Sequence, residues 1–374
     1  MAGIYIHIPF CASRCVYCGF YSTTLSARRD AYVDAVCREM EMRAPMMGRG
    51  KDVRTVYLGG GTPSQLAPAQ LERLLSYIYK VSDAQPEEVT MECNPDDITP
   101  DMARWIASSP VNRVSMGAQT FSDSRLRLIR RRHTAKEVST AVERLRSAGI
   151  SNISIDLMFG FPGETLDEWD DDISRALSLH VEHISAYSLM YEEGTPLFRW
   201  LQEGRVSEID DELSLAMYER LVNRLTAAGY QHYEISNFAL PGRESKHNSS
   251  YWQDVPYVGL GASAHSFDGR VRSWNVADVE QYIEGMARGE RLCEEELLDV
   301  QTHYDDVVMT SLRTSRGISL DKIARDFGRE RLEYLLAAAQ EDIGRGLLIV
   351  ENGHLRLTRE GIYLSDGITE RLFA

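Results

Sequence analysis

Short hydrophobic runs alternate with longer amphipathic stretches over the first three-quarters of the chain. The runs are rich in β-branched residues and are typical of buried strands, whereas the stretches between them repeat their apolar residues with helical periodicity. The pattern predicts strands at residues 4–8, 53–58, 89–92, 113–116, 153–158 and 183–187, and helices at 28–43, 68–79 and 99–107. Repeated strand–helix units predict an α/β fold with a parallel sheet, which can curve into a barrel.

The pattern changes after about residue 205. A helix is predicted at 211–228, and Asp268-Gly269 marks a hairpin turn. In the last part, helices at 320–327 and 331–344 precede a second hairpin around Asn352-Gly353, and this order is typical of a winged helix. We therefore expect a first domain of residues 1–290, with an extension over about 205–290, and a C-terminal helical, winged-helix-like domain of residues 291–374.

Composition and charge narrow the range of functions. The formal net charge is −15, and the 43% of hydrophobic and 26% of charged residues are ordinary for a globular protein. An acidic chain is a poor partner for nucleic acid, and residues 317–374 are themselves acidic, with 8 Lys or Arg against 10 Asp or Glu. The sequence has no apolar run long enough to cross a bilayer, and the first residues lack the basic start of a signal peptide. A cytoplasmic protein is therefore expected.

Three of the six cysteines lie close together near the N-terminus. Cys11, Cys15 and Cys18 have the spacing C-x3-C-x2-C, which fits three irons of a cubic [4Fe–4S] cluster. The fourth iron then stays open to a small molecule that carries an amine and a carboxylate. A zinc site is the alternative, but zinc usually takes paired C-x2-C ligands, and the sequence offers no second pair.

Further candidates fall at the carboxyl ends of predicted strands, where parallel sheets place their chemistry. The glycine run 59–61 permits a close approach of the backbone to a ligand, although a plain tight turn explains it equally. Glu92 and Asp156 end apolar strands and can accept hydrogen bonds from hydroxyl or ammonium groups, with solvated charges as the alternative. Tyr17 lies between two of the clustered cysteines and can pack against an adenine ring or in the core.

Five motifs extend this pattern in order: Tyr5-Ile-His-Ile-Pro-Phe-Cys11, Gly59-Gly-Gly-Thr-Pro63, Glu92-Cys-Asn-Pro95, Ser115-Met-Gly-Ala-Gln119-Thr-Phe121 and Asp156-Leu-Met-Phe-Gly-Phe-Pro162. Together with the cysteines, they resemble the oxygen-independent coproporphyrinogen III oxidase family of radical S-adenosylmethionine (SAM) proteins over nearly the whole chain. The resemblance implies a radical SAM partial (β/α) barrel, a [4Fe–4S] cluster on the three cysteines, and SAM as a cofactor. The residues that it assigns to SAM are Tyr5, Tyr17, Gly60, Gly61, Thr62, Glu92, Gln119, Arg131 and Asp156.

Two features distinguish the branches of this family. The oxidases carry a fourth cysteine two places after the third, where this chain has Phe20. Residues 247–252 read His-Asn-Ser-Ser-Tyr-Trp and resemble the H-N-x-x-Y-W signature of HemW-type haem chaperones, which bind haem and pass it to target proteins. In a polar, accessible loop, His247 can donate to haem iron, and Trp252 can cover the porphyrin ring. A packing role is the alternative, His265 is a competing ligand, and His7 is expected in the core or behind the site.

The resemblance therefore favours a haem chaperone that carries a cluster, SAM and haem as its bound cargo. An oxygen-independent coproporphyrinogen III oxidase, which forms protoporphyrinogen IX in porphyrin biosynthesis, is the alternative, and whether the chain is an enzyme stays open. The implied partners are haem or porphyrin, a haem-accepting target protein and an electron donor. Peripheral membrane contact and a homodimer are further options, and nucleic acid is not expected.

Overall fold

A computed structural model describes residues 3–374 of the chain, and its main feature is one large curved sheet. The sheet has twelve strands in the order β12-β11-β10-β9-β1-β2-β3-β4-β5-β6-β8-β7. Seven neighbouring strands are parallel, namely β9 (Tyr257–Leu260), β1 (Gly3–Ile8), β2 (Thr55–Gly60), β3 (Glu88–Cys93), β4 (Arg113–Gln119), β5 (Ile153–Phe159) and β6 (His183–Ser188). The predicted parallel α/β fold is confirmed.

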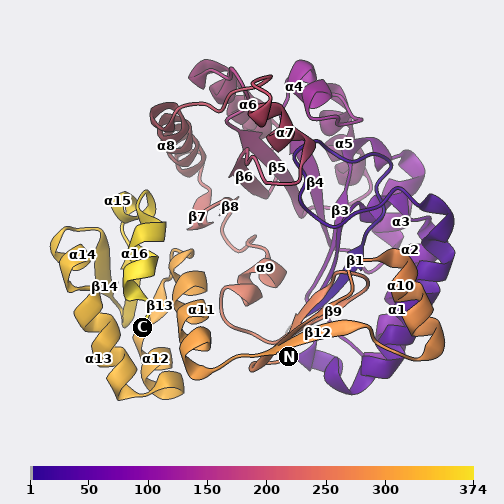
Figure 1. Ribbon diagram of the computed structural model, residues 1–374. Helices are drawn as coiled ribbons and strands as arrows, with labels where there is room; N and C mark the ends of the chain where they lie inside the picture. The colour runs from indigo at the N-terminus through magenta and orange to yellow at the C-terminus, as the bar shows by residue number, and fades with distance from the viewer. Residues whose placement is uncertain (1–2) are drawn as a thin grey trace.

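Six helices cover the outer side of the curved sheet (Figure 1). They are α1 (Arg29–Arg43), α2 (Pro68–Ser82), α3 (Pro100–Ser108), α4 (Asp123–Leu128), α5 (Ala135–Ser147) and α6 (Leu166–Ser178). Their starts follow local sequence signals: the Thr99 side chain caps α3 by accepting from the backbone of Met102, and Thr165 caps α6 in the same way. A sheet with helices on its outer side alone is a partial barrel with an inner face.

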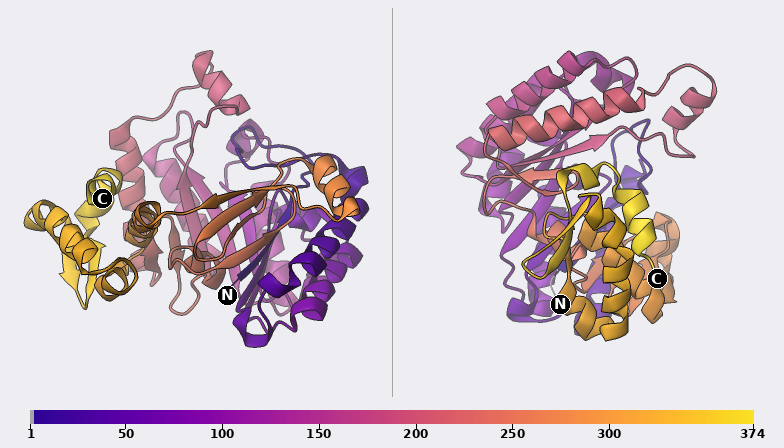
Figure 2. Two further views of the ribbon diagram at one scale, coloured as in Figure 1. Left: turned by 60° about the horizontal axis from the view of Figure 1, so that its bottom comes forward. Right: turned by 90° about the vertical axis from the view of Figure 1, so that its left-hand side faces the viewer.

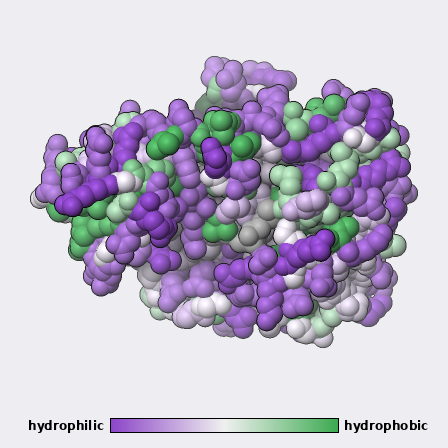
Figure 3. All heavy atoms as spheres, turned by 90° about the horizontal axis from the view of Figure 1, so that it is seen from below, coloured by the Kyte–Doolittle hydropathy of each residue, from purple (hydrophilic) through white to green (hydrophobic). Residues whose placement is uncertain are grey.

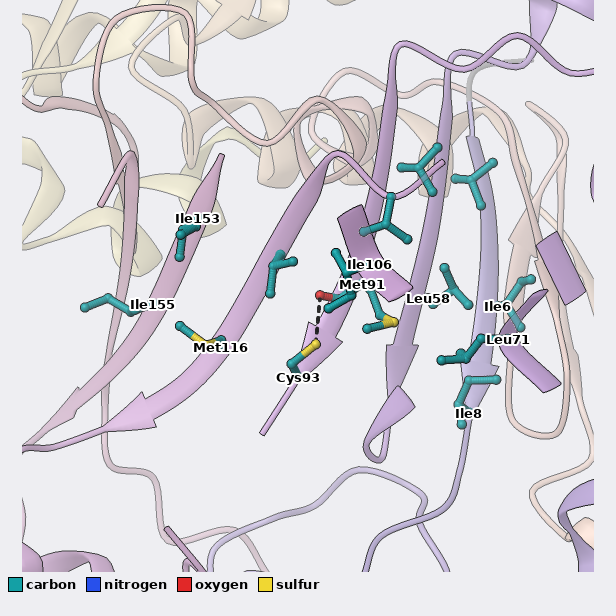
Figure 4. Close-up of a cluster of buried hydrophobic side chains, with 14 of the residues drawn as sticks. Ile6, Ile8, Leu58, Leu71, Met91, Cys93, Ile106, Met116, Ile153 and Ile155 are labelled. Carbon is teal, nitrogen blue, oxygen red and sulfur yellow. Dashed lines mark hydrogen bonds between the residues drawn. The ribbon is translucent and has the colours of Figure 1, made fainter. Parts of the chain in front are cut away.

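Strand alternation decides which side chains reach that inner face. Ile4, Ile6 and Ile8 of β1 are fully buried in the main hydrophobic core, and Figure 4 shows the last two beside Leu58 of β2 and Leu71 of α2. Because successive side chains of a strand point to opposite faces, the intervening Tyr5 and His7 face the inside of the barrel. The polar positions between the core residues therefore supply the inner surface.

The extension predicted over about 205–290 adds antiparallel strands to both edges of the sheet. They are β7 (Gln231–Glu234), β8 (Asn237–Ala239), β10 (His265–Phe267), β11 (Val271–Asn275) and β12 (Cys293–Leu297), and the helices nearby are α7 (Pro196–Gln202), α8 (Asp211–Ala227), α9 (Lys246–Tyr251) and α10 (Val279–Arg288). Because β12 pairs with β11 along its whole length, the large sheet continues to Leu297, past the boundary predicted at residue 290. The glutamates of β12 are exposed, so this edge strand lacks the apolar alternation that identifies a strand.

The C-terminal domain has a separate hydrophobic core and lies beside the barrel (Figure 2). It consists of α11 (Val300–Leu312), β13 (Ile318–Ser319), α12 (Leu320–Phe327), α13 (Arg329–Ala338), α14 (Gln340–Gly344), β14 (Leu348–Glu351), β15 (His354–Leu357), α15 (Arg359–Ile362) and α16 (Ser365–Leu372). Helices followed by the β14–β15 hairpin give the predicted winged-helix-like arrangement. The single helix predicted at 331–344 is instead two helices, which are separated at Ala339.

The surface of the molecule is largely hydrophilic on the face that Figure 3 shows, with hydrophobic side chains in patches between polar ones. Among residues 3–374, no helix combines the length and apolar character that a membrane span needs.

Candidate cluster and cofactor site

A pocket of about 620 Å³ opens at the carboxyl ends of the parallel strands. Cys11, Cys15 and Cys18 line it, and all three are free, partly exposed thiols. The pocket also brings together every predicted SAM residue except Tyr5, namely Tyr17, Gly60, Gly61, Thr62, Glu92, Gln119, Arg131 and Asp156. Residues as far apart in sequence as Cys11 and Asp156 thus meet at one edge of the sheet, as the strand-end argument predicts.

The three cysteines lie on one long loop after β1, which backbone hydrogen bonds hold in place. The amide of Cys11 donates to the carbonyl of Thr23 at 2.9 Å, and the amide of Val16 donates to the carbonyl of Ile129 at 3.3 Å. Burial raises the pKa of the Cys18 thiol. Within residues 3–374, no three His, Cys, Asp or Glu side chains converge on the position of a single metal ion. Three thiols spread around one pocket suit a multi-iron cluster better than a zinc ion.

Glycines at the end of β2 allow the chain to turn and to lie against the start of the cysteine loop. Gly60 has a φ of +110°, which a residue with a side chain rarely adopts. The amide of Gly61 donates to the carbonyl of Ile8 at 2.8 Å, and a Cβ at this glycine would lie only 2.8 Å from the carbonyl carbon of Pro9. The end of β2 therefore lies directly against the start of the cysteine loop, and backbone groups of both border the pocket.

Two partly buried carboxyl groups, Glu92 and Asp156, line the pocket from β3 and β5. Glu92 accepts a hydrogen bond from the Tyr57 hydroxyl at 2.7 Å and another from the amide of Gly60 at 3.1 Å. Burial raises the pKa of Glu92 to about 7 in spite of these donors, and the charge of Asp156 acts in the same direction. Burial also raises the pKa of Asp156. These carboxyl groups are positioned to accept hydrogen bonds from a ligand, rather than to lie in solvent.

Arg131 connects the cysteine loop to β4. Its guanidinium donates to the carbonyl of Gly117 at 2.6 Å and to the side chain of Asn94, and it lies 3.7 Å from the sulfur of Cys15. A Cβ at Gly117 would come within 2.8 Å of this guanidinium, so the glycine makes room for it. Next to it, Gln119 has a φ of +66° where the pairing of β4 with β5 shifts register, and this bulge directs the chain around the pocket.

Some residues of the site were not predicted from the sequence. Asn94, Ser115 and Gly117 line the pocket and lie inside the motifs quoted above, but nothing in those motifs gave them a separate role. Tyr57 reaches Glu92 from inside the barrel, and strand alternation in β2 is the signal that could have found it. Tyr5 lies outside the pocket lining. Its hydroxyl hydrogen-bonds to Nδ1 of His7 at 3.1 Å inside the barrel.

The structure corrects the prediction that His247 lies in an accessible loop. His247 is only 1% exposed and lies in the short helix α9, whose first amides donate to the buried carboxylate of Glu88. Nδ1 of its ring is 2.8 Å from the Thr55 hydroxyl, and Nε2 is 2.8 Å from the Tyr251 hydroxyl. Burial, assisted by the charge of Arg113, lowers the pKa of His247 to about 3. Both ring nitrogens are therefore engaged, and the imidazole is neutral.

The other residues considered for haem contact lie in different surroundings. Trp252, directly after α9, is partly buried, and the guanidinium of Arg313 lies over its ring at 5.2 Å. His265 in β10 is exposed and stacks on Trp274, with the ring centres 5.8 Å apart. His7 is buried, as expected, and its Nε2 lies 3.1 Å from the carbonyl of Tyr21.

Comparison with known proteins identifies the family. Residues 5–176 match the model of the radical SAM superfamily, and residues 298–364 match the HemN C-terminal domain. The heme chaperone HemW of Bacillus subtilis is 37% identical to this chain over 373 residues and 98% of each chain. That of Lactococcus lactis is 35% identical, over 98% of this chain and 96% of its own. The chain belongs to the HemW family of radical SAM proteins.

The solved structure of the coproporphyrinogen III oxidase HemN from Escherichia coli, a radical SAM enzyme, has the same fold. It superposes on this chain with a TM-score of 0.85 and 22% sequence identity, over 100% of this chain and 90% of its own. Membership of the radical SAM superfamily implies a [4Fe–4S] cluster and SAM. The pocket fits both groups, since three free thiols, glycine backbone and two carboxyl groups are among the groups that line it.

Proposed function

We propose that the protein is a haem chaperone that binds a [4Fe–4S] cluster and SAM in the described pocket and passes haem to acceptor proteins. The observation that carries the proposal is the 37% identity to a protein named heme chaperone HemW, because it extends over 98% of the chain, including the C-terminal domain. The pocket adds chemical support, since the predicted cluster cysteines and all the predicted SAM residues except Tyr5 line it.

Each part of the pocket has a proposed role in holding these groups. Cys11, Cys15 and Cys18 would hold the cluster through their thiolates. Glu92 and Asp156 would accept hydrogen bonds from the hydroxyl and ammonium groups of SAM. The segment Gly60–Thr62 would present backbone groups to its amino-acid part, and Tyr17, Gln119 and Arg131 would border the rest of the ligand. When bound, the cluster and SAM supply one-electron chemistry, and the chain orients the ligand and shields it from water.

Haem contact at α9 is the less direct part of this proposal. For His247 to donate to haem iron, its hydrogen bond to Thr55 or to Tyr251 must open and the ring must leave a buried site. Trp252 is closer to the surface, but its ring already lies under Arg313. An electron donor, a haem-accepting protein, a homodimer and a peripheral membrane contact belong to the proposal as partners, with the cytoplasm as its location.

Two measurements on one protein preparation can distinguish a haem chaperone from a coproporphyrinogen III oxidase. The protein is reconstituted with iron and sulfide without oxygen, and one portion is titrated with haem while the absorbance is followed. A second portion receives SAM, a reductant and coproporphyrinogen III. We expect saturable haem binding and no protoporphyrinogen IX. Formation of protoporphyrinogen IX without haem binding would instead identify the protein as an oxidase. Cys15→Ala, which removes a proposed cluster ligand, is the control that shows whether any product depends on the cluster.

A further inference from the structure

Three large hydrophobic side chains are exposed at the mouth of the cluster pocket. Phe20 is 71% exposed, Met190 is 62% exposed and Tyr187 is 42% exposed, and all three line the pocket. Exposed apolar side chains of this size are unfavourable in water, so three together at one opening mark a surface that binds something apolar. Phe20 occupies the place where the related oxidases have a fourth cysteine.

Tyr187 belongs to β6, and the other two apolar side chains come from loops that are packed against each other. Phe20 ends the cysteine loop, and Met190 follows β6. The amide of Leu197 donates to the carbonyl of Val16 at 3.0 Å. Gly19 lies so close to Glu192 that a Cβ at the glycine would overlap the carboxylate, with 1.9 Å to its nearest oxygen. The two loops therefore hold Phe20 and Met190 at one opening.

Two arginines without ionic partners border the same opening. Arg14 and Arg130 line the pocket and are exposed, and within residues 3–374 neither guanidinium forms a hydrogen bond or an ion pair. That of Arg130 lies over the ring of Trp200 at 5.9 Å. Arg132 also lines the pocket, but Asp96 and Asp97 already pair with it. Glu192 is an acidic group at this opening, so the opening offers an anion the two unpaired guanidinium groups of Arg14 and Arg130 rather than a net positive charge.

We propose that this mouth is the docking site of the haem cargo. Phe20 and Met190 pack against the flat porphyrin, Arg14 and Arg130 pair with its two propionates, and the bound haem covers the cluster pocket. This inference rests on the proposed function, which supplies haem as the ligand. The mouth offers exposed apolar side chains and free cations, whereas the ring of His247 in α9 is buried and has both nitrogens engaged.

Haem titration of cluster-loaded full-length variants tests the apolar part of the site. We expect Phe20→Ser and Met190→Ala each to weaken haem binding at least tenfold, whereas Met190→Leu, which keeps an apolar side chain, stays within threefold of the original protein. The matched control is Met309→Ala, because Met309 is an exposed methionine of the C-terminal domain, and its loss should leave the affinity unchanged. Iron content and thermal unfolding establish that each variant is folded and loaded. An equal loss for Met190→Leu and Met190→Ala would contradict the packing role.

A second titration tests the arginines with haem and with its dimethyl ester, which lacks both carboxylates. We expect the double variant Arg14→Gln, Arg130→Gln to bind haem about tenfold more weakly and to bind the ester as the original protein does. Arg329→Gln is the control, because this exposed arginine lies in the C-terminal domain and, within residues 3–374, pairs with Glu333 alone. Equal losses for haem and for the ester would contradict pairing with the propionates.

The outcomes separate this inference from the proposed function. If the original protein binds haem and the variants at the mouth bind it equally well, the docking site is wrong and the function stands. The same holds if His247→Gln alone abolishes binding. If the original protein shows no saturable haem binding, the proposed function fails, and the docking site fails with it.

Discussion

Glu92 shows how burial sets the chemistry of a single residue in the pocket. Burial raises the pKa of this carboxyl group to about 7, although the Tyr57 hydroxyl and the Gly60 amide donate to it and favour the ionised form. Its charge therefore changes near neutral pH. An ionised carboxylate only accepts hydrogen bonds, whereas the protonated group must also donate one, so its fit to a ligand with donors depends on pH.

We expect the affinity for SAM to rise as the pH rises from about 6 to about 8, because Glu92 ionises above its pKa and then accepts hydrogen bonds from the ligand. Glu92→Gln should weaken SAM binding about tenfold at the higher pH and should flatten the dependence. Two neighbouring charges also affect this titration: that of Asp156, whose own pKa is raised, raises the pKa of Glu92, and that of Arg113 lowers it. Calorimetry on cluster-loaded protein measures the affinity, with the exposed Glu87→Gln as the control. A pH profile that is equally steep in both variants would contradict the role of Glu92.

The sequence predicted the pocket residues well and the surroundings of His247 poorly, for a physical reason. Cys11, Cys15 and Gly60 are recognisable because thiolate ligation and a positive φ restrict the residue type. The polar stretch around His247 suggested an accessible loop. Its polar groups are instead satisfied by Glu88 and Thr55, which belong to distant strands. Burial created by partners that lie far away in sequence leaves no local pattern.

The buried ring of His247 should therefore stabilise the fold. Because burial lowers its pKa to about 3, the contribution is fully present above about pH 6.5, the pKa in the unfolded chain, and is lost as the pH falls through that value toward about 3. When the pH falls from about 7.5 to about 5, we expect the free energy of unfolding to decrease less in His247→Gln than in the original protein. At neutral pH, we expect His247→Ala to lower the free energy of unfolding by about 2–4 kcal/mol. Urea unfolding at several pH values measures both. Unchanged stability in His247→Ala would show that the ring is not a packing element.

At the scale of elements, the end of β2 and the cysteine loop act as one unit. Gly61 lies against the backbone of Pro9, and that backbone cannot move without shifting the first cysteine. The sequence predicted β2 and its glycines from a hydrophobic run and a turn signal, but it contained no information on which segment the glycines touch. Edge strand β12 was missed because its glutamates are exposed, and pairing with β11 alone makes it a strand.

Adding one methyl group at this contact should disturb the cluster site. We expect Gly61→Ala to cost about 1–3 kcal/mol of stability, because the new Cβ meets backbone atoms that cannot rotate away, and to lower both iron content and SAM affinity. Gly344→Ala in α14 is the matched control, because a Cβ there meets no atom within 4 Å and the helix favours alanine. Iron analysis and denaturant unfolding measure the two effects. Normal cluster loading in Gly61→Ala would contradict the coupling.

On the scale of the whole molecule, a segment that runs from α9 to Asp254 joins the barrel to the C-terminal domain. His247 fixes one end of it inside the barrel through Thr55. At the other end, Asp254 accepts hydrogen bonds from His303 of α11 at 2.9 Å and from Lys322 of α12 at 2.7 Å. In this structure the H-N-x-x-Y-W motif therefore belongs to a connection between the two cores.

Removing Asp254 should loosen the C-terminal domain without unfolding the barrel. We expect Asp254→Ala to increase hydrogen exchange in α11 and α12, because His303 and Lys322 lose a partly buried carboxylate partner, at a cost of about 1–3 kcal/mol. Hydrogen exchange followed by mass spectrometry measures this per segment, with the exposed pair variant Glu333→Ala as the control. Because β1–β6 keep their own core, their protection and the cluster content should stay unchanged. Equal loss of protection in both domains would mean that the two cores unfold as one unit, and the separate-domain interpretation would be wrong.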